Sequence, residues 1–228
     1  GGGSSEIIQP SNRGTAPAIL YSLLSIGRED PNAQAALFPA DHYFSDDIAF
    51  TRYVDLAFQA VARQPDLVVL LGVVPTGPEV EYGWIQPGAP VRGVTAGRVL
   101  RVRRFWEKPS LEIAKRLLAR RCLWNSFVLA GSVQTLLRLY RRTVPELYSC
   151  FEAFRPMIGT DREQRAIHDL YARVSPIDFS KEVLCACPVA LSVLPVEDAS
   201  WTDLGSIDRV LKVAASCECG RIEREQAS

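Results

Sequence analysis

One uninterrupted apolar run, LVVLLGVV at residues 67–74, limits the folds open to this chain more than any other feature. A half-exposed strand alternates apolar and polar residues, whereas a continuous run is typical of a strand that helices cover on both faces. The preceding segment has helical spacing, with apolar residues at Phe50, Val54, Ala57, Phe58 and Val61. Before it, the short apolar run AQAALF ends at Pro39. A strand, a helix and a strand in succession predict a parallel sheet.

The remaining patterns continue this alternation and predict one α/β domain. We expect further strands at 98–109, 123–131 and 188–196, an irregular stretch at 75–97, and helices at 15–26, 110–119, 132–140, 145–154, 161–171 and 207–214. Asp46 or Asp47 and Ser132 have the residue types that cap helix N-termini. The predicted fold is therefore a doubly wound, mostly parallel, Rossmann-like sheet with helices on both faces.

Composition restricts the partners. Lys+Arg and Asp+Glu are balanced at 26 each, so no overall field favours a nucleic-acid backbone. No run approaches the roughly 18 apolar residues of a membrane span, and the N-terminus lacks a secretory pattern, so we expect a cytoplasmic protein. Residues 1–5, GGGSS, have linker composition. Self-association into a homo-oligomer is left open.

Six cysteines include two C-x-C pairs, Cys185 with Cys187 and Cys217 with Cys219. Common zinc sites use C-x-x-C spacing, so we interpret these residues as reduced thiols and leave a zinc site as the alternative.

Two acids follow predicted strands, Asp41 after AQAALF and Asp203 after 188–196. Ligands of open α/β sheets bind beyond the carboxyl ends of strands, and two carboxylates converging there suit Mg²⁺ shared with substrate phosphates. The alternative is that both acids only cap turns or helices. A generic doubly wound domain of that kind predicts that Asp41 and Asp203 are far apart in space.

Six short motifs occur in a fixed order: QPSNRGTAPAI (9–19), FPADH (38–42), PTGPEVEYGWI (75–85), FWEKP (105–109), LWNSF (123–127) and WTDLGS (201–206). Together they resemble the sugar-1-phosphate nucleotidyltransferase family, and most closely the bacterial mannose-1-phosphate guanylyltransferases. Each motif is weak alone, and their shared order carries the resemblance. It implies a fold of the nucleotide-diphospho-sugar transferase type over residues 6–216, with 217–228 as a tail.

The resemblance implies a nucleotide site and a metal site. Gln9, Gly14 and Thr15 would lie against the nucleotide, because an amide pairs with a base edge and glycine lets the backbone approach closely. Asp41 and Asp203 match the family's metal-binding acids, with Mg²⁺ as the cofactor. A capped helix start at Thr15 without a ligand is the structural alternative.

The resemblance also implies a sugar site. Gly83, Glu107 and Asn125 would contact the sugar, and Lys108 would present its charge to the sugar phosphate. A solvated Glu–Lys couple and a turn asparagine are the alternatives. The family more often has glycine before the tyrosine of the third motif, where this chain has Glu81.

The implied reaction is an in-line displacement. The phosphate of a hexose 1-phosphate, by analogy mannose 1-phosphate, attacks the α-phosphorus of a nucleoside triphosphate, by analogy GTP, and pyrophosphate leaves. Asp41, Lys108 and Asp203 would be the catalytic group. The family begins with a strand and a glycine-rich triphosphate loop that this sequence lacks, and we expect the natural protein to contain them. The alternative is a non-catalytic subunit that binds sugar nucleotides.

Overall fold

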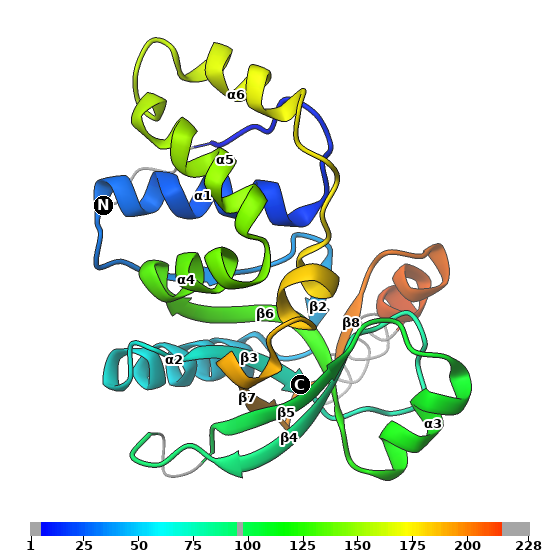
Figure 1. Ribbon diagram of the computed structural model, residues 1–228. Coiled ribbons are helices and arrows are strands. Elements are labelled where there is room, and N and C mark those ends of the chain that lie inside the picture. The colour runs from blue at the N-terminus through cyan, green and yellow to red at the C-terminus, as the bar shows by residue number, and fades with distance from the viewer. Residues whose placement is uncertain (1–5, 95–97, 216–228) are drawn as a thin grey trace, which may run out of the picture.

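The computed structural model describes residues 6–94 and 98–215 as a layered α/β domain (Figure 1). Its helices include α1 (Thr15–Glu29), α2 (Asp47–Arg63), α3 (Leu111–Ala119), α4 (Val133–Thr143), α5 (Pro145–Phe154) and α6 (Glu163–Tyr171). Its strands are β1 (Gln34–Leu37), β2 (His42–Phe44), β3 (Val68–Val73), β4 (Trp84–Pro90), β5 (Leu100–Trp106), β6 (Leu123–Ser132), β7 (Leu191–Val196) and β8 (Trp201–Asp203). Short turns of tighter or wider helix occupy Arg155–Met157, Ser180–Leu184 and Pro188–Ala190.

The central sheet has the strand order β1-β6-β3-β7-β5-β4, and β4 also pairs with β6. The pairings make β1, β3, β4 and β7 run in one direction and β5 and β6 in the other. The sheet is thus mostly parallel in strand direction, as predicted, although among the described strands only β3 and β7 are parallel hydrogen-bonded neighbours. Antiparallel β6 lies between β1 and β3, which the strand–helix–strand pattern did not indicate.

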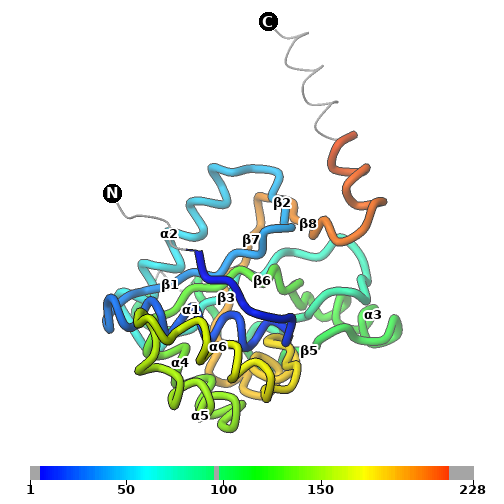
Figure 2. The backbone as a smooth tube through the Cα atoms, turned by 90° about the horizontal axis from the view of Figure 1, so that it is seen from above, coloured from blue at the N-terminus to red at the C-terminus, as the bar shows by residue number. Residues whose placement is uncertain are grey.

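Helices cover both faces of this sheet, which explains the continuous apolar run. Along β3, Val68 and Leu70 belong to the core under α1, α4, α5 and α6, whereas Val69 and Leu71 belong to the core under α2 and α3. Figure 2 shows α4, α5 and α6 on one side of β3 and β6, with α2 on the other. All six residues of β3 are buried. The predicted doubly wound architecture is confirmed.

Local capping follows the predicted chemistry. The Asp46 carboxylate accepts hydrogen bonds from the backbone N–H groups of Ile48 and Ala49, each at 2.9 Å. Ser132 Oγ accepts from the N–H of Thr135 at 3.2 Å. These side chains satisfy donors that the first helical turn leaves without partners, so α2 and α4 begin where the sequence predicted.

Three strands were not predicted. β4 lies in the stretch expected to be irregular, and its sequence WIQPGAP contains two prolines and a glycine that strands usually exclude. Its pairing with β5 shifts register around Pro87, which accommodates these residues. β2 and β8 form a separate two-stranded sheet and are three residues each, too short for a periodic pattern.

Residues 207–215 are helical, as predicted. Their apolar side chains do not enter the core: Ile207 is 79% exposed and Leu211 is 61% exposed. In Figure 2 this helix, coloured orange to red, projects from the body of the domain. No helix within 6–94 and 98–215 is both long and apolar enough to cross a membrane.

Candidate functional site

The register of β4 brings three of the predicted sugar-site residues together. Trp84 pairs with Trp106 of β5 and with Trp124 of β6. Gly83, one residue before β4, therefore faces both Glu107 and Asn125. The N–H of Asn125 donates to the carbonyl oxygen of Gly83 at 2.8 Å. A Cβ at position 83 would lie 2.8 Å from Glu107 Oε2 and 3.2 Å from the Asn125 Cβ, so only glycine leaves this space open.

The two-stranded sheet brings the two acids together. His42 in β2 is the register partner of Asp203 in β8, and the N–H of Leu204 donates to the carbonyl oxygen of Asp41 at 2.7 Å. The backbone therefore holds Asp41 and Asp203 side by side despite their distance in sequence. This placement contradicts the alternative of a generic domain with the two acids far apart.

Tyr82 joins the two groups. Its ring centroid is 4.7 Å from that of Trp201 in β8, and its hydroxyl is 3.2 Å from Thr202 Oγ1. Tyr82 also lines a cavity, whereas Trp84 is fully buried and its Nε1–H donates to the carbonyl oxygen of Glu79. Tyr82 fixes β8 against the start of β4.

Between the two groups lies a cavity of about 310 Å³, within the range of small-ligand sites. It contains every predicted sugar and metal residue. Its lining consists of Asp41, His42, Glu81, Tyr82, Gly83, Glu107, Lys108, Asn125, Phe127, Ser180, Trp201, Asp203, Gly205 and Arg209. The lining has four carboxylates and two cationic side chains. The carboxylates suit a ligand with many hydroxyl donors, and a phosphate on that ligand would need a further cation to offset its charge.

Glu107 is the least satisfied group in the cavity. Its Oε2 is buried and accepts no hydrogen bond from any residue in the described part of the chain. Burial, with the negative charge of Asp178 nearby, raises the pKa of this carboxyl to about 7, and the charge of Lys108 opposes the rise only partly. A buried oxygen without a donor costs free energy, so this position is suited to accept hydrogen bonds from a ligand.

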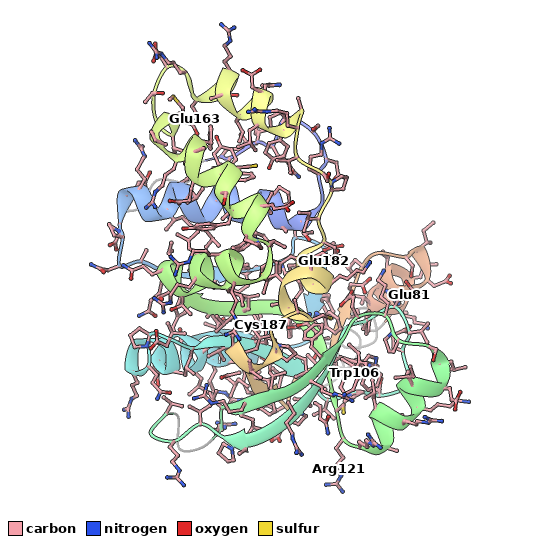
Figure 3. All side chains as sticks on the ribbon, viewed as in Figure 1. Glu81, Trp106, Arg121, Glu163, Glu182 and Cys187 are labelled. Atoms are coloured by element: carbon pink, nitrogen blue, oxygen red, sulfur yellow. The ribbon has the colours of Figure 1, made fainter. Side chains whose placement is uncertain are left out.

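Lys108 directs its ammonium group toward Glu81, with Nζ 3.5 Å from Oε2. Glu81 is the residue that departs from the family pattern, and Figure 3 shows it on the segment before β4, near the orange segment that follows β8. Both side chains are exposed, so the pair is weakly held and screened by solvent. Lys108 has φ of 46°, an uncommon backbone conformation for a residue with a side chain.

The two acids differ in their surroundings. The Asp41 side chain is 65% exposed, with His42 Nε2 3.8 Å from its Oδ1. Asp203 Oδ1 and Oδ2 each lie 2.7 Å from Arg209 Nη1, and Oδ1 also accepts from the N–H of Gly205 at 2.8 Å. The carboxylate oxygens are the ligand type that Mg²⁺ prefers. In the described chain, however, no group of three or more His, Cys, Asp or Glu residues gathers around one point, so Mg²⁺ fits only with further ligands from substrate phosphates or water.

His42 has a structural role. Its Nδ1 accepts a hydrogen bond from Trp201 Nε1–H at 3.3 Å, which requires an unprotonated Nδ1. Burial lowers the pKa of His42, with the charges of Asp41 and Asp203 opposing the shift. The imidazole therefore fixes β8 against β2.

The predicted nucleotide residues lie outside this cavity and make internal contacts. Thr15 Oγ1 accepts from the N–H of Phe179 at 2.8 Å, and Gln9 Oε1 lies 3.5 Å from the hydroxyl of Tyr171. Gly14 has φ of 81°, and a Cβ there would be 2.4 Å from the carbonyl oxygen of Ile177. These contacts join the start of α1 to the segment that leads to Ser180 on the cavity wall. The nucleotide role of the three residues stays a prediction.

Sequence reasoning missed two charged residues of the cavity, Glu81 as the partner of Lys108 and Arg209 as the partner of Asp203. Glu81 carried a signal, its departure from the family pattern. Arg209 lies six residues after Asp203, just inside the helix that the sequence predicted, and only the turn between them directs it back.

The cysteines show no sign of a zinc site in the described residues, where no cluster of metal ligands forms. Burial raises the pKa of the Cys185 thiol to about 12, so it stays protonated. Cys217 and Cys219 lie outside the described residues, as do the predicted linker at 1–5 and the tail at 217–228.

Comparison with known proteins confirms the resemblance. A family model described as nucleotidyl transferase matches residues 4–219. The xanthan biosynthesis protein XanB of Xanthomonas campestris pv. campestris (strain B100) is 32% identical over 216 residues, covering 92% of this chain and 44% of the relative. Mannose-1-phosphate guanylyltransferase of Escherichia coli (strain K12) is 28% identical over 233 residues, covering 95% of this chain and 45% of the relative.

The fold is shared with a solved structure. A mannose-1-phosphate geranyltransferase from Thermus thermophilus has 30% sequence identity and a TM-score of 0.72, over 87% of this chain and 54% of that chain. The chain spans less than half the length of the two curated relatives.

Proposed function

Because the chain belongs to the nucleotidyl transferase family, we propose that it joins a hexose 1-phosphate to a nucleoside triphosphate and releases pyrophosphate. We further propose mannose 1-phosphate and GTP as the substrates. The support for these two is the description of relatives such as the Escherichia coli protein as mannose-1-phosphate guanylyltransferases. A cytoplasmic location remains a prediction from the sequence.

The observation that carries this proposal is the buried Oε2 of Glu107, which has no hydrogen-bond partner among the residues that the structure describes and lies in the cavity that also contains Lys108 and both predicted metal acids. Sugar hydroxyls are donors that would satisfy this oxygen. Asn125, which is 6% exposed, and the backbone at Gly83 would position the same sugar ring. Lys108 would then leave Glu81 and pair with the sugar phosphate, because its flexible side chain can turn from one anion to another.

The chain's own contribution to the reaction is positioning. The attacking atom is the phosphate oxygen of the sugar, so no side-chain nucleophile is required. The protein would hold this oxygen in line with the α-phosphorus. We propose that Asp41 and Asp203 hold Mg²⁺. When bound, it would offset the negative charge of the phosphates. Gln9, Gly14 and Thr15 would contact the nucleotide from the α1 side.

Pyrophosphate release from GTP and mannose 1-phosphate in the presence of Mg²⁺ tests the proposal. We expect turnover by the protein and its loss in Asp41→Asn, Asp203→Asn and Glu107→Gln variants whose circular dichroism is unchanged. Arg116→Met is the matched control, because Arg116 pairs with Glu112 on α3 and does not line the cavity. Absence of both turnover and binding of any hexose 1-phosphate would refute the proposal.

A second function, sugar-nucleotide binding without turnover, is favoured by one observation. Two of the three proposed catalytic residues are engaged internally, Lys108 with Glu81 and Asp203 with Arg209. In the same assay this function predicts that GDP-mannose binds and that no pyrophosphate is released from any pair of substrates.

A further inference from the structure

Arg209 holds the carboxylate of Asp203 by two hydrogen bonds. Its Nη1 lies 2.7 Å from each carboxylate oxygen. Arg209 lies in the first turn of the helix at 207–215, and the N–H of Gly205 fixes Asp203 Oδ1 from the turn before it. A guanidinium in this position satisfies the same lone pairs that a divalent cation would use.

Arg209 also contacts a second carboxylate and an aromatic ring. Its Nη2 is 3.5 Å from Glu79 Oε2, and its Cζ is 4.8 Å from the ring centroid of Tyr82. The Arg209 side chain is 20% exposed, so these contacts are largely shielded from solvent. If Asp203 were withdrawn, the guanidinium would keep an anionic partner and an aromatic face.

Asp41 differs from Asp203 in being open. Its carboxylate is 65% exposed, and within the described residues the basic side chain that lies near it is His42, whose imidazole is uncharged while its Nδ1 accepts from Trp201. A cation therefore reaches Asp41 directly, whereas reaching Asp203 requires that Arg209 leave. The pairing of β2 with β8 places the two acids side by side, so one cation can contact Asp41 and then Asp203.

We propose that Arg209 is the built-in counter-ion of Asp203 and that a divalent cation binds by displacing it toward Glu79. Arg209 is thus a positioning residue that lowers metal affinity and keeps Asp203 oriented until the cation arrives. This inference rests on the proposed use of Asp41 and Asp203 as metal ligands. A purely structural ion pair, which only fixes the start of the helix, is the alternative.

Direct titration with Mn²⁺, followed by the electron paramagnetic resonance signal of the free ion, tests this inference without any substrate. Arg209→Met removes the guanidinium and keeps an unbranched apolar side chain in place of the aliphatic part of arginine. Lys108→Met is the matched control, because it removes another cation from the same cavity without freeing Asp203. Asp203→Asn identifies the site that is titrated.

We expect Arg209→Met to bind Mn²⁺ about tenfold more tightly than the wild type, the effect of removing charge-assisted hydrogen bonds that compete for the ligand. Lys108→Met should change the affinity by less than about threefold, since only a screened charge is lost. Asp203→Asn should abolish the tight binding.

Unchanged or weaker binding in Arg209→Met, or an equal gain in Lys108→Met, would overturn the inference and leave the proposed function standing if Asp203→Asn still abolishes binding. Absence of Mn²⁺ binding in every variant would overturn both the inference and the proposed metal site. Pyrophosphate release measured on the same samples then shows separately whether turnover occurs.

Discussion

The buried carboxyl of Glu107 lowers the stability of the fold, and the proposed function uses the same group to bind the sugar. Its Oε2 is buried and accepts no hydrogen bond from residues 6–94 and 98–215, and burial, with the charge of Asp178, raises the pKa of the carboxyl to about 7. The folded chain therefore prefers the protonated carboxyl, whereas the unfolded chain releases its proton near the ordinary value of 4.5. A raised pKa of this kind contributes stability below pH 4.5 and loses that contribution as the pH rises through 7.

Replacing Glu107 with glutamine should remove this pH dependence. We predict that the free energy of unfolding of Glu107→Gln exceeds that of the wild type by a margin that grows from pH 4.5 to pH 7, because an amide does not ionise. Urea denaturation of both proteins near pH 5 and near pH 8 measures the margin. A margin that is constant with pH would show that Glu107 is not the group that titrates.

The same residue predicts a pH dependence of binding with the opposite sign. Sugar hydroxyls donate to a carboxylate more strongly than to a protonated carboxyl, so mannose 1-phosphate should bind the wild type more tightly near pH 8 than near pH 6. Calorimetric titration at the two pH values checks this. Equal pH dependence in Glu107→Gln would assign the effect to another group, such as the phosphate of the ligand.

The motifs predicted which residues gather at one cavity, but not which side chains they pair with. Asp41, Glu107, Asn125 and Asp203 lie in short motifs, and all four line one cavity. That Arg209 clamps Asp203 depends on a turn that reverses the chain at Gly205, a geometry that residue types alone do not specify.

The registers of the strand pairs bring the residues of the cavity together. The pairs Trp84 with Trp106 and Trp84 with Trp124 bring the proposed sugar-site residues together, and the pair His42 with Asp203 brings the two acids together. The helices were predictable because apolar periodicity and capping side chains are local signals. Three strands were not predictable from local signals. β2 and β8 are very short, β4 contains proline, and all three pair with partners that are distant in sequence.

The start of α1 offers a test of one element's attachment. Gly14 has φ of 81° and ψ of −177°, a combination open to glycine alone, and a Cβ there would meet the Ile177 carbonyl oxygen at 2.4 Å. We predict that Gly14→Ala lowers the free energy of unfolding by about 3 kcal/mol, through backbone strain and this clash.

Gly93→Ala is the comparison, since Gly93 has φ of 79° and open space where a Cβ would lie. It should cost about 1 kcal/mol, from the backbone conformation alone. Chemical denaturation of the two variants gives the difference. Equal losses would mean that the contact with Ile177 does not hold the start of α1.

The candidate site lies at one end of a three-layer domain. The cavity is lined by residues from the end of β5, from the starts of β4 and β6, and from the small sheet of β2 and β8, which packs against Tyr82. The doubly wound architecture was predictable from the continuous apolar strand. The insertion of antiparallel β6 between β1 and β3 was not, since strand order depends on long-range pairing that hydrophobic periodicity does not encode.

If the chain acts as proposed, this cavity binds the sugar end of the substrate. A crystal structure of the chain with mannose 1-phosphate tests it most directly. We predict hexose hydroxyls within hydrogen-bonding distance of Glu107 Oε2 and Asn125, with the phosphate at Lys108 in place of Glu81. A hexose bound elsewhere on the chain, with Glu107 Oε2 still unpartnered, would contradict the account.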